Sequence, residues 1–184
     1  MKSKVVIGVV GMPGAGKSEV SRTAAELSFQ LVVMGDIVRE EAKKAGLDPT
    51  PENIGHIMLE LREREGSQVV ARRCIPKIQA SPSRAVIVDG LRSPAEVQIL
   101  RETFSGFKVL CMHASPETRF HRLFGRGRSD DPANWAVFEE RDERELSVGI
   151  GSVIALADFL IVNQGTKKQL KTKVTRLLEH RLTQ

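Results

Sequence analysis

The sequence predicts a three-layer α/β/α fold with a five-stranded parallel sheet, and three observations support this prediction. Five short runs of aliphatic residues, most of them rich in valine and isoleucine, lack the polar alternation of a half-exposed strand. Helical patterns separate these runs, so strands and helices alternate along the chain. A glycine-rich segment directly follows the first run and opens a helical pattern, as expected for the first strand–loop–helix unit of such a fold.

Residue patterns locate the predicted elements in order. Strands are predicted at residues 5–10, 31–34, 85–88, 109–112 and 159–162. Between the second and third strands, Thr50 and Pro51 supply an N-cap and a first-turn proline for a helix. After the third strand, Ser93-Pro94-Ala95-Glu96 has the spacing of a capping box. Residues 125–135 are polar and charged without helical or strand periodicity, so we expect a loop there.

The composition indicates a globular protein that binds small anions. The 184 residues suffice for one domain with its own core, and 41% of them are hydrophobic. The net charge of +5 suits phosphorylated ligands, but only 4% of residues are aromatic, so we expect no nucleic-acid partner. No stretch is apolar enough for a membrane span, and we expect a cytoplasmic monomer or homo-oligomer. Cys74 and Cys111 lack metal-ligand spacing and are expected to be buried.

The segment after the first strand carries the strongest chemical signal. It reads GMPGAGKS, which fits the phosphate-binding pattern G-x-x-x-x-G-K-[ST]. In that pattern backbone N–H groups converge on phosphates, the lysine reaches the β- and γ-phosphates, and the serine hydroxyl ligates Mg²⁺. Lys17 is therefore the first expected catalytic residue, and Ser18 is an expected metal ligand. The expected ATP contacts here are Gly11, Met12, Pro13, Gly14, Ala15, Gly16, Lys17, Ser18 and Glu19.

A magnesium-side acid is expected at the end of a neighbouring buried strand. Asp89 directly follows the third predicted strand, at the sheet edge where the phosphate loop also lies. An aspartate that only shapes the turn before Gly90 is the alternative interpretation. In a phosphate-binding fold we favour Asp89 as the second metal-side residue.

Arginines are concentrated around the 125–135 loop. Arg119, Arg122 and Arg126 follow one another at spacings of three and four, which places them along one face of a predicted helix. Arg128 lies within the loop itself. We interpret this concentration as one half of a clamp on phosphates, with Arg122 on the ATP side.

The next predicted helix supplies the other half of this clamp. Arg141 and Arg144 share a face with Val137 and Val148, so two guanidinium groups interrupt an otherwise apolar stripe. Solvated surface charge explains either arginine alone, but not the grouping of five around one loop. The expected catalytic arginines are Arg126, Arg141 and Arg144.

These segments resemble the nucleoside monophosphate kinases and their relative dephospho-CoA kinase, and most closely an archaeal adenylate-kinase-related group. The segment MGDIVR, ending at Arg39, is similar to the Gly-Asp-x-x-Arg segment of adenylate kinases. The resemblance implies that Arg39 grips the acceptor phosphate and that Asp36 faces the transfer point. The segment VDGLR resembles their Asp-Gly-Phe-Pro-Arg segment and implies a second acceptor arginine at Arg92, although the proline is absent and the arginine comes one residue early.

Residues 157–166 are similar to the base-side segment of dephospho-CoA kinases. This similarity implies that Asn163 and Gly165 lie against the adenine of ATP. The overall resemblance implies a P-loop NTPase fold in a single domain over residues 1–184, with a helical acceptor-binding region at about 36–80 and a short lid at about 119–146. No Asn-Lys-x-Asp motif of guanine recognition is present.

The sequence thus favours a kinase that moves the γ-phosphoryl of ATP·Mg²⁺ to a small phosphorylated acceptor. A nucleoside monophosphate is the first candidate acceptor, and dephospho-CoA is the alternative. A nucleotide-dependent switch or accessory ATPase is a further alternative from a different class of protein. If the acceptor is a hydroxyl, we expect Asp36 to accept its proton.

Overall fold

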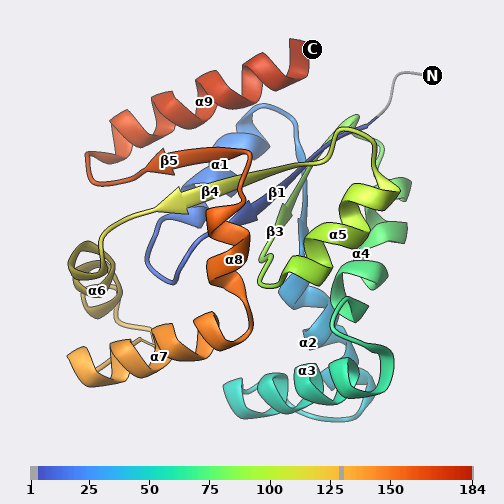
Figure 1. Ribbon diagram of the computed structural model, residues 1–184, viewed down its shortest axis with the longest axis vertical. Helices are drawn as coiled ribbons and strands as arrows, with labels where there is room; N and C mark the ends of the chain where they lie inside the picture. Colours follow the sequence, from blue (N-terminus) through green and yellow to red (C-terminus); the bar gives the residue numbers. More distant parts are fainter. Residues whose placement is uncertain (1–3, 129–130, 184) are drawn as a thin grey trace.

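The computed structural model describes residues 4–128 and 131–183, and it confirms the five-stranded parallel sheet (Figure 1). The strand order is β2-β3-β1-β4-β5, so the chain crosses over between strands that are not neighbours in the sequence. Every pair of neighbouring strands is parallel, which places all carboxyl ends at one edge of the sheet. The strands are β1 (Val5–Val10), β2 (Gln30–Val33), β3 (Ala85–Asp89), β4 (Lys108–His113) and β5 (Phe159–Val162).

Helices cover both faces of the sheet, and the sheet separates the hydrophobic core into two clusters (Figure 1). On one face, α1 (Lys17–Glu26) and α9 (Lys167–Thr183) bury residues such as Val20 and Val174 against β1 and β4. On the other face, α4 (Val69–Ala80), α5 (Pro94–Thr103) and α8 (Ile150–Ala155) bury residues such as Ile78, Leu100 and Val153. Since helices cover both faces of the central strands, β1, β3 and β4 are buried along most of their length, as their apolar runs predicted. The edge strand β5 differs, because Leu160 and Val162 are 59% and 44% exposed.

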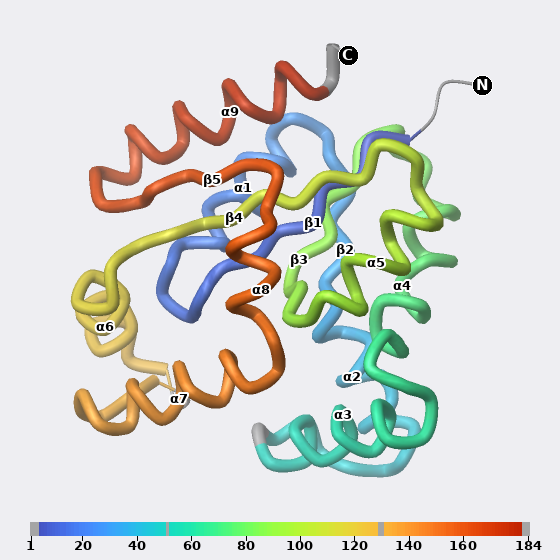
Figure 2. Tube along the Cα trace, in the orientation of Figure 1, coloured from blue at the N-terminus to red at the C-terminus, as the bar shows by residue number. Residues whose placement is uncertain are grey.

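Two helical pairs flank the carboxyl edge of the sheet. One pair is α2 (Met34–Lys44) and α3 (Pro51–Glu65), and the other is α6 (Pro116–Phe124) and α7 (Trp135–Ser147). The trace in Figure 2 shows these pairs on either side of the strand ends, with the loop after β1 between them. They occupy the regions that the sequence predicted as the acceptor-binding region and the lid.

Local sequence signals explain where these helices begin. The Thr50 side chain accepts a hydrogen bond from the Asn53 backbone at the start of α3. Ser93 and Glu96 form the expected capping box at α5. Asn134 caps α7, so the predicted loop ends one residue earlier than expected and Trp135 is helical. Ser129 and Asp130 of that loop lie outside the described residues.

The two cysteines are buried and unbridged, which confirms the expectation from their spacing. Burial raises the pKa of the Cys74 thiol to about 12 and that of Cys111 to about 11, so both are inert packing residues. Among the described helices, none combines the length and apolarity that a membrane crossing requires.

Candidate functional site

A cavity of about 650 Å³ opens at the carboxyl edge of the sheet, between the two flanking helical pairs. Most of the residues singled out from the sequence line it together, although they come from distant parts of the chain. These are Gly11, Pro13, Gly14, Gly16, Lys17, Ser18, Glu19, Arg39, Asp89, Arg92, Arg122, Arg126, Arg141, Asn163 and Gly165. Met12, Ala15, Asp36 and Arg144 are the predicted site residues that do not line it.

The phosphate loop is shaped by close packing at two glycines. Gly14 has a φ of 81°, and a Cβ there would lie 2.7 Å from the Arg119 backbone oxygen. Gly16 has a φ of 103°, and a Cβ there would lie 2.3 Å from Nδ2 of Asn163. Both positions therefore require glycine for conformation and for space. Ala15 is buried behind the loop, and the Asn163 amide holds its carbonyl with a 2.9 Å hydrogen bond.

Lys17 lies at the centre of the loop. Its Nζ donates to the Gly11 carbonyl at 2.5 Å and to the Met12 carbonyl at 3.4 Å. Burial lowers the pKa of Lys17, although the carboxylates of Asp89 and Glu145 act in the opposite direction. A cation that has lost much of its hydration gains strongly from an anionic ligand, which suits a lysine that binds phosphate.

Asp89 meets the requirements of a magnesium-side acid. Its Oδ2 accepts a hydrogen bond from the Ser21 hydroxyl at 3.3 Å, while its buried Oδ1 has no hydrogen-bond partner among the described residues. Burial raises the pKa of Asp89, opposed by Lys17 and Ser21. An unsatisfied buried carboxylate oxygen beside a phosphate loop fits Mg²⁺, with Ser18 lining the same space. The described residues contain no group of three or more His, Cys, Asp or Glu side chains placed to hold a metal ion.

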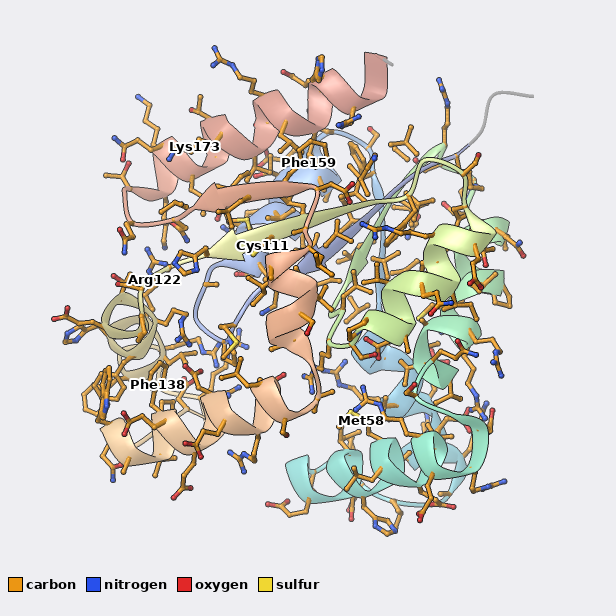
Figure 3. The ribbon with its side chains drawn as sticks, in the orientation of Figure 1. Met58, Cys111, Arg122, Phe138, Phe159 and Lys173 are labelled. Atoms are coloured by element: carbon orange, nitrogen blue, oxygen red, sulfur yellow. The ribbon has the colours of Figure 1, made fainter. Side chains whose placement is uncertain are left out.

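Arg122 and Asn163 form the nucleotide-side wall of the cavity. Arg122 extends from α6 toward the ends of β4 and β5, where its Nη2 donates to the Asn163 carbonyl at 3.0 Å (Figure 3). Its Nη1 is buried without a hydrogen-bond partner in the described part of the chain, and burial lowers the pKa of the guanidinium. Arg122 therefore has hydrogen-bonding capacity left for a ligand. Asn163, in contrast, donates its side-chain amide to the Ala15 carbonyl and so supports the phosphate loop.

Not all of the arginines predicted to form the clamp line the cavity. Arg126, Arg128 and Arg141 line the cavity, and Arg126 makes a bidentate ion pair with Asp131 of the same loop. Arg144 is exposed and does not line the cavity, whereas Glu145 does. Around the helix axis Glu145 lies about 40° from Arg141 on one side and Arg144 about 60° on the other, so the cavity faces the side that Arg141 and Glu145 share. The inward-facing stripe of α7 thus contains one arginine and one glutamate rather than two arginines.

The two arginines predicted to bind the acceptor, Arg39 and Arg92, line the cavity and have acidic neighbours. Arg39 pairs with Asp36 on the first turn of α2, and both side chains are more than half exposed. Arg92 reaches into the cavity, where its Nε lies 3.6 Å from Oε2 of Glu145. Its backbone N–H donates to the Glu96 carboxylate at 2.8 Å. Arg92 therefore lines the cavity although its spacing departs from that of the adenylate-kinase segment.

Sequence reasoning missed three features of the site. Glu145 and Lys167 line the cavity but were not singled out, although Glu145 follows Arg141 by the four residues that place two side chains on one helical face. The third feature is the ion pair between Arg119 and Asp142, which are 23 residues apart. No local sequence pattern predicts that ion pair, because it depends on how α6 and α7 pack against each other.

Relatives of this chain span nearly its whole length. A protein of Methanothermobacter thermautotrophicus described as a UPF0200 protein is 49% identical over 95% of this chain and 92% of its own length. A UPF0200 protein of Hyperthermus butylicus is 46% identical over 98% of this chain and 96% of its own length. This chain belongs to the UPF0200 family. Residues 10–139 also match the profile of an AAA domain, which contains the phosphate loop and most of the predicted clamp.

Solved structures place this UPF0200 chain among small kinases in fold. A shikimate kinase from Bacteroides thetaiotaomicron superposes with a TM-score of 0.63 at 16% identity, covering 95% of this chain and 98% of that one. A gluconokinase from Sinorhizobium meliloti superposes with a TM-score of 0.56 at 16% identity, covering 98% and 94%. At these identities the likeness establishes a P-loop kinase-like fold, as the sequence predicted.

Proposed function

We propose that this UPF0200 protein is a kinase that transfers the γ-phosphoryl group of ATP·Mg²⁺ to a small anionic metabolite. One observation carries the proposal: a single cavity is lined both by the phosphate loop and by two further arginines, Arg39 and Arg92. Arg126 and Arg141 line the same cavity, and Arg92 and Arg141 lie close enough to Lys17 to lower its pKa. Phosphoryl transfer requires little covalent help from a protein, so positioning and cationic stabilisation are the chemistry needed.

Each end of the cavity has a defined part in this reaction. Lys17 and the backbone N–H groups of the loop bind the β- and γ-phosphates, and Ser18 and Asp89 would hold Mg²⁺, which neutralises charge on those phosphates. Arg39 and Arg92 bind an anionic group of the acceptor and place its nucleophilic oxygen in line. Arg141 offsets the charge that spreads over the transferred group.

A nucleoside monophosphate remains our first candidate acceptor, because two arginines at the acceptor end suit a phosphate dianion. Dephospho-CoA is the alternative suggested by the segment around Asn163. The kinases of similar fold carry the names shikimate kinase and gluconokinase, so hydroxyl acceptors with a carboxylate belong to the same test. For such an acceptor Asp36 and Glu145 are the carboxylates near the acceptor arginines.

An assay of ADP release tests the proposal over AMP, CMP, UMP, GMP, dTMP, dephospho-CoA, shikimate and gluconate. We expect one acceptor to raise ADP release well above the rate with ATP alone, and only with Mg²⁺ present. Arg92→Ala is expected to require a higher acceptor concentration for the same stimulation, with ATP binding nearly unchanged. A slow hydrolysis that no acceptor stimulates, together with a nucleotide-dependent change in oligomeric state, would instead identify a switch or accessory ATPase.

A further inference from the structure

Arg119 occupies a position that the proposed reaction does not explain. Its side chain is 5% exposed, and its guanidinium makes a bidentate ion pair with Asp142 of α7, at 2.8 Å and 2.6 Å. The same Nη1 atom also donates to the Pro13 carbonyl of the phosphate loop at 3.3 Å. Arg119 therefore bridges the phosphate loop and the lid helix without facing the cavity itself.

The contact with Pro13 fixes the direction of a phosphate-binding group. Pro13 and Gly14 share one peptide unit, and the described chain contains no cis peptide bonds. In a trans unit the C=O and the N–H point to opposite sides. Since the Pro13 carbonyl accepts from Arg119 on α6, the Gly14 N–H is directed to the opposite side of the peptide unit, away from Arg119. That orientation leaves the Gly14 N–H available to a bound phosphate.

The contact with Asp142 fixes the lid helix. Asp142 follows Arg141 directly and precedes Glu145 by three residues, so the ion pair sets the rotation of α7 that turns both residues to the cavity. Phe138 lies one turn earlier on α7, toward α6 (Figure 3). The Arg119 guanidinium lies 4.9 Å from the centre of its ring, a cation–π distance.

An aromatic cluster makes α6 and α7 one packed unit. The ring of Phe120 lies 5.2 Å from that of Trp135 and 5.6 Å from that of Phe138, both edge-on. Trp135 and Phe138 are 5.2 Å apart. The two helices are therefore held together by a cluster of aromatic rings and by a buried ion pair, and only the ion pair also touches the phosphate loop.

We propose that Arg119 and Asp142 couple occupancy of the phosphate loop to the position of α7, so that ATP binding sets Arg141 for transfer. This inference rests on the proposed function and adds how ATP binding would control the position of Arg141. Arg119 is a positioning residue, since it acts through the Gly14 N–H on one side and through α7 on the other. By reciprocity, a shift of α7 that breaks the ion pair weakens ATP binding by the same factor that ATP binding stabilises α7.

The chain carries its own reporter for this coupling. Trp135 is the single tryptophan and lies at the start of α7 in contact with Phe120 and Phe138. Its emission therefore reports the packing of the lid helix, while calorimetry measures ATP binding independently. We expect ATP·Mg²⁺ to change Trp135 emission in the wild-type chain with the same dissociation constant that calorimetry gives.

The test compares three variants with this wild-type response. Asp142→Asn is expected to bind ATP about tenfold more weakly and to lose at least half of the emission change, because a charge-assisted contact is replaced by a weaker one. Arg119→Lys keeps the positive charge but not the two-sided fork, so its emission change should also be reduced. The matched control is Asp158→Asn, since Asp158 also pairs with an arginine and is similarly buried, with 20% exposure against 16% for Asp142. Asp158 pairs with Arg101 and Lys108 and accepts from the Val109 N–H, all away from the phosphate loop. The Asp158→Asn variant should therefore respond as the wild type does.

The outcomes separate this inference from the proposed function. If calorimetry shows ATP binding but Trp135 emission does not change in the wild-type chain, the coupling is wrong and the kinase proposal stands. Wild-type affinity and response in Asp142→Asn would also overturn the coupling, as would an equal loss in Asp158→Asn. If the wild-type chain binds no ATP by calorimetry, the proposed function fails and the coupling fails with it.

Discussion

Two arginine–aspartate pairs near the cavity are held in very different ways. Arg119 supports the phosphate loop from outside the cavity, is 5% exposed and pairs with Asp142, which is 16% exposed. At the acceptor end, Arg39 and its partner Asp36 are 57% and 53% exposed. Buried pairs hold one geometry, whereas exposed pairs contribute little energy and exchange partners readily. On the proposed function, the phosphate-loop side is built before ATP arrives, whereas the Arg39–Asp36 pair is exchanged for contacts with the substrate.

The largest expected effect is at the donor end. Lys17→Ala should lower kcat by at least about 10³-fold, because the variant loses the cation that bridges the β- and γ-phosphates. The fold should be retained, since the removal of a desolvated charge offsets the loss of the two hydrogen bonds that Lys17 donates to the Gly11 and Met12 carbonyls. Turnover and thermal unfolding of the purified variant check both statements, with Lys168→Ala on the exposed side of α9 as the control. Unchanged turnover in Lys17→Ala would remove the phosphate-loop assignment.

The next effect separates two arginines on one helix. Arg141→Ala should lower kcat by about 10²–10³-fold with a much smaller change in ATP affinity, since Arg141 lines the transfer path. Arg144→Ala is the matched control, because Arg144 is exposed on the same helix and does not line the cavity, and its effect should be below about threefold. Equal losses in the two variants would restore the sequence-based expectation that both arginines form the clamp.

A smaller effect is expected at the acceptor end. Arg39→Ala and Arg92→Ala should each raise the KM for the acceptor by about 10- to 100-fold, with the KM for ATP nearly constant. Arg64→Ala, which removes a similar exposed ion pair with Glu60 on α3, should change neither constant. If Arg39→Ala raised both KM values equally, Arg39 would be a structural residue of α2 and the two-ended description would be wrong there.

The smallest expected effect is a pH dependence of magnesium binding. Because burial raises the pKa of Asp89, protons compete with Mg²⁺ there at a higher pH than at an exposed aspartate. The magnesium-dependent part of ATP affinity should therefore fall as pH is lowered from neutrality toward that raised pKa. Calorimetry with and without Mg²⁺ measures it, and Asp89→Asn should show the weaker pH dependence of ATP alone. Identical pH profiles in the variant and the wild type would exclude Asp89 from the metal site.

The same contrast explains what the sequence could predict. The sheet and the phosphate loop follow from local patterns, since strands buried on both faces are apolar throughout and the loop needs glycines at fixed spacing. The acceptor arginines were found through resemblance. In contrast, the Arg119–Asp142 pair depends on the packing of two helices, and which of Arg141 and Arg144 faces the cavity depends on the rotation of α7. Neither quantity is encoded in a local pattern, because both arginines fit an amphipathic stripe equally well.

The fate of the γ-phosphoryl group tests the central claim most directly. The protein is incubated with ATP labelled in the γ-phosphoryl group, Mg²⁺ and a protein-free extract of small metabolites, and the labelled products are separated. We predict that the label moves to an organic acceptor, that Arg92→Ala lowers the rate at which this product forms by about 10- to 100-fold at low acceptor concentration, and that little label appears as inorganic phosphate. Label found only as inorganic phosphate, at a rate that the extract does not change, would contradict the account.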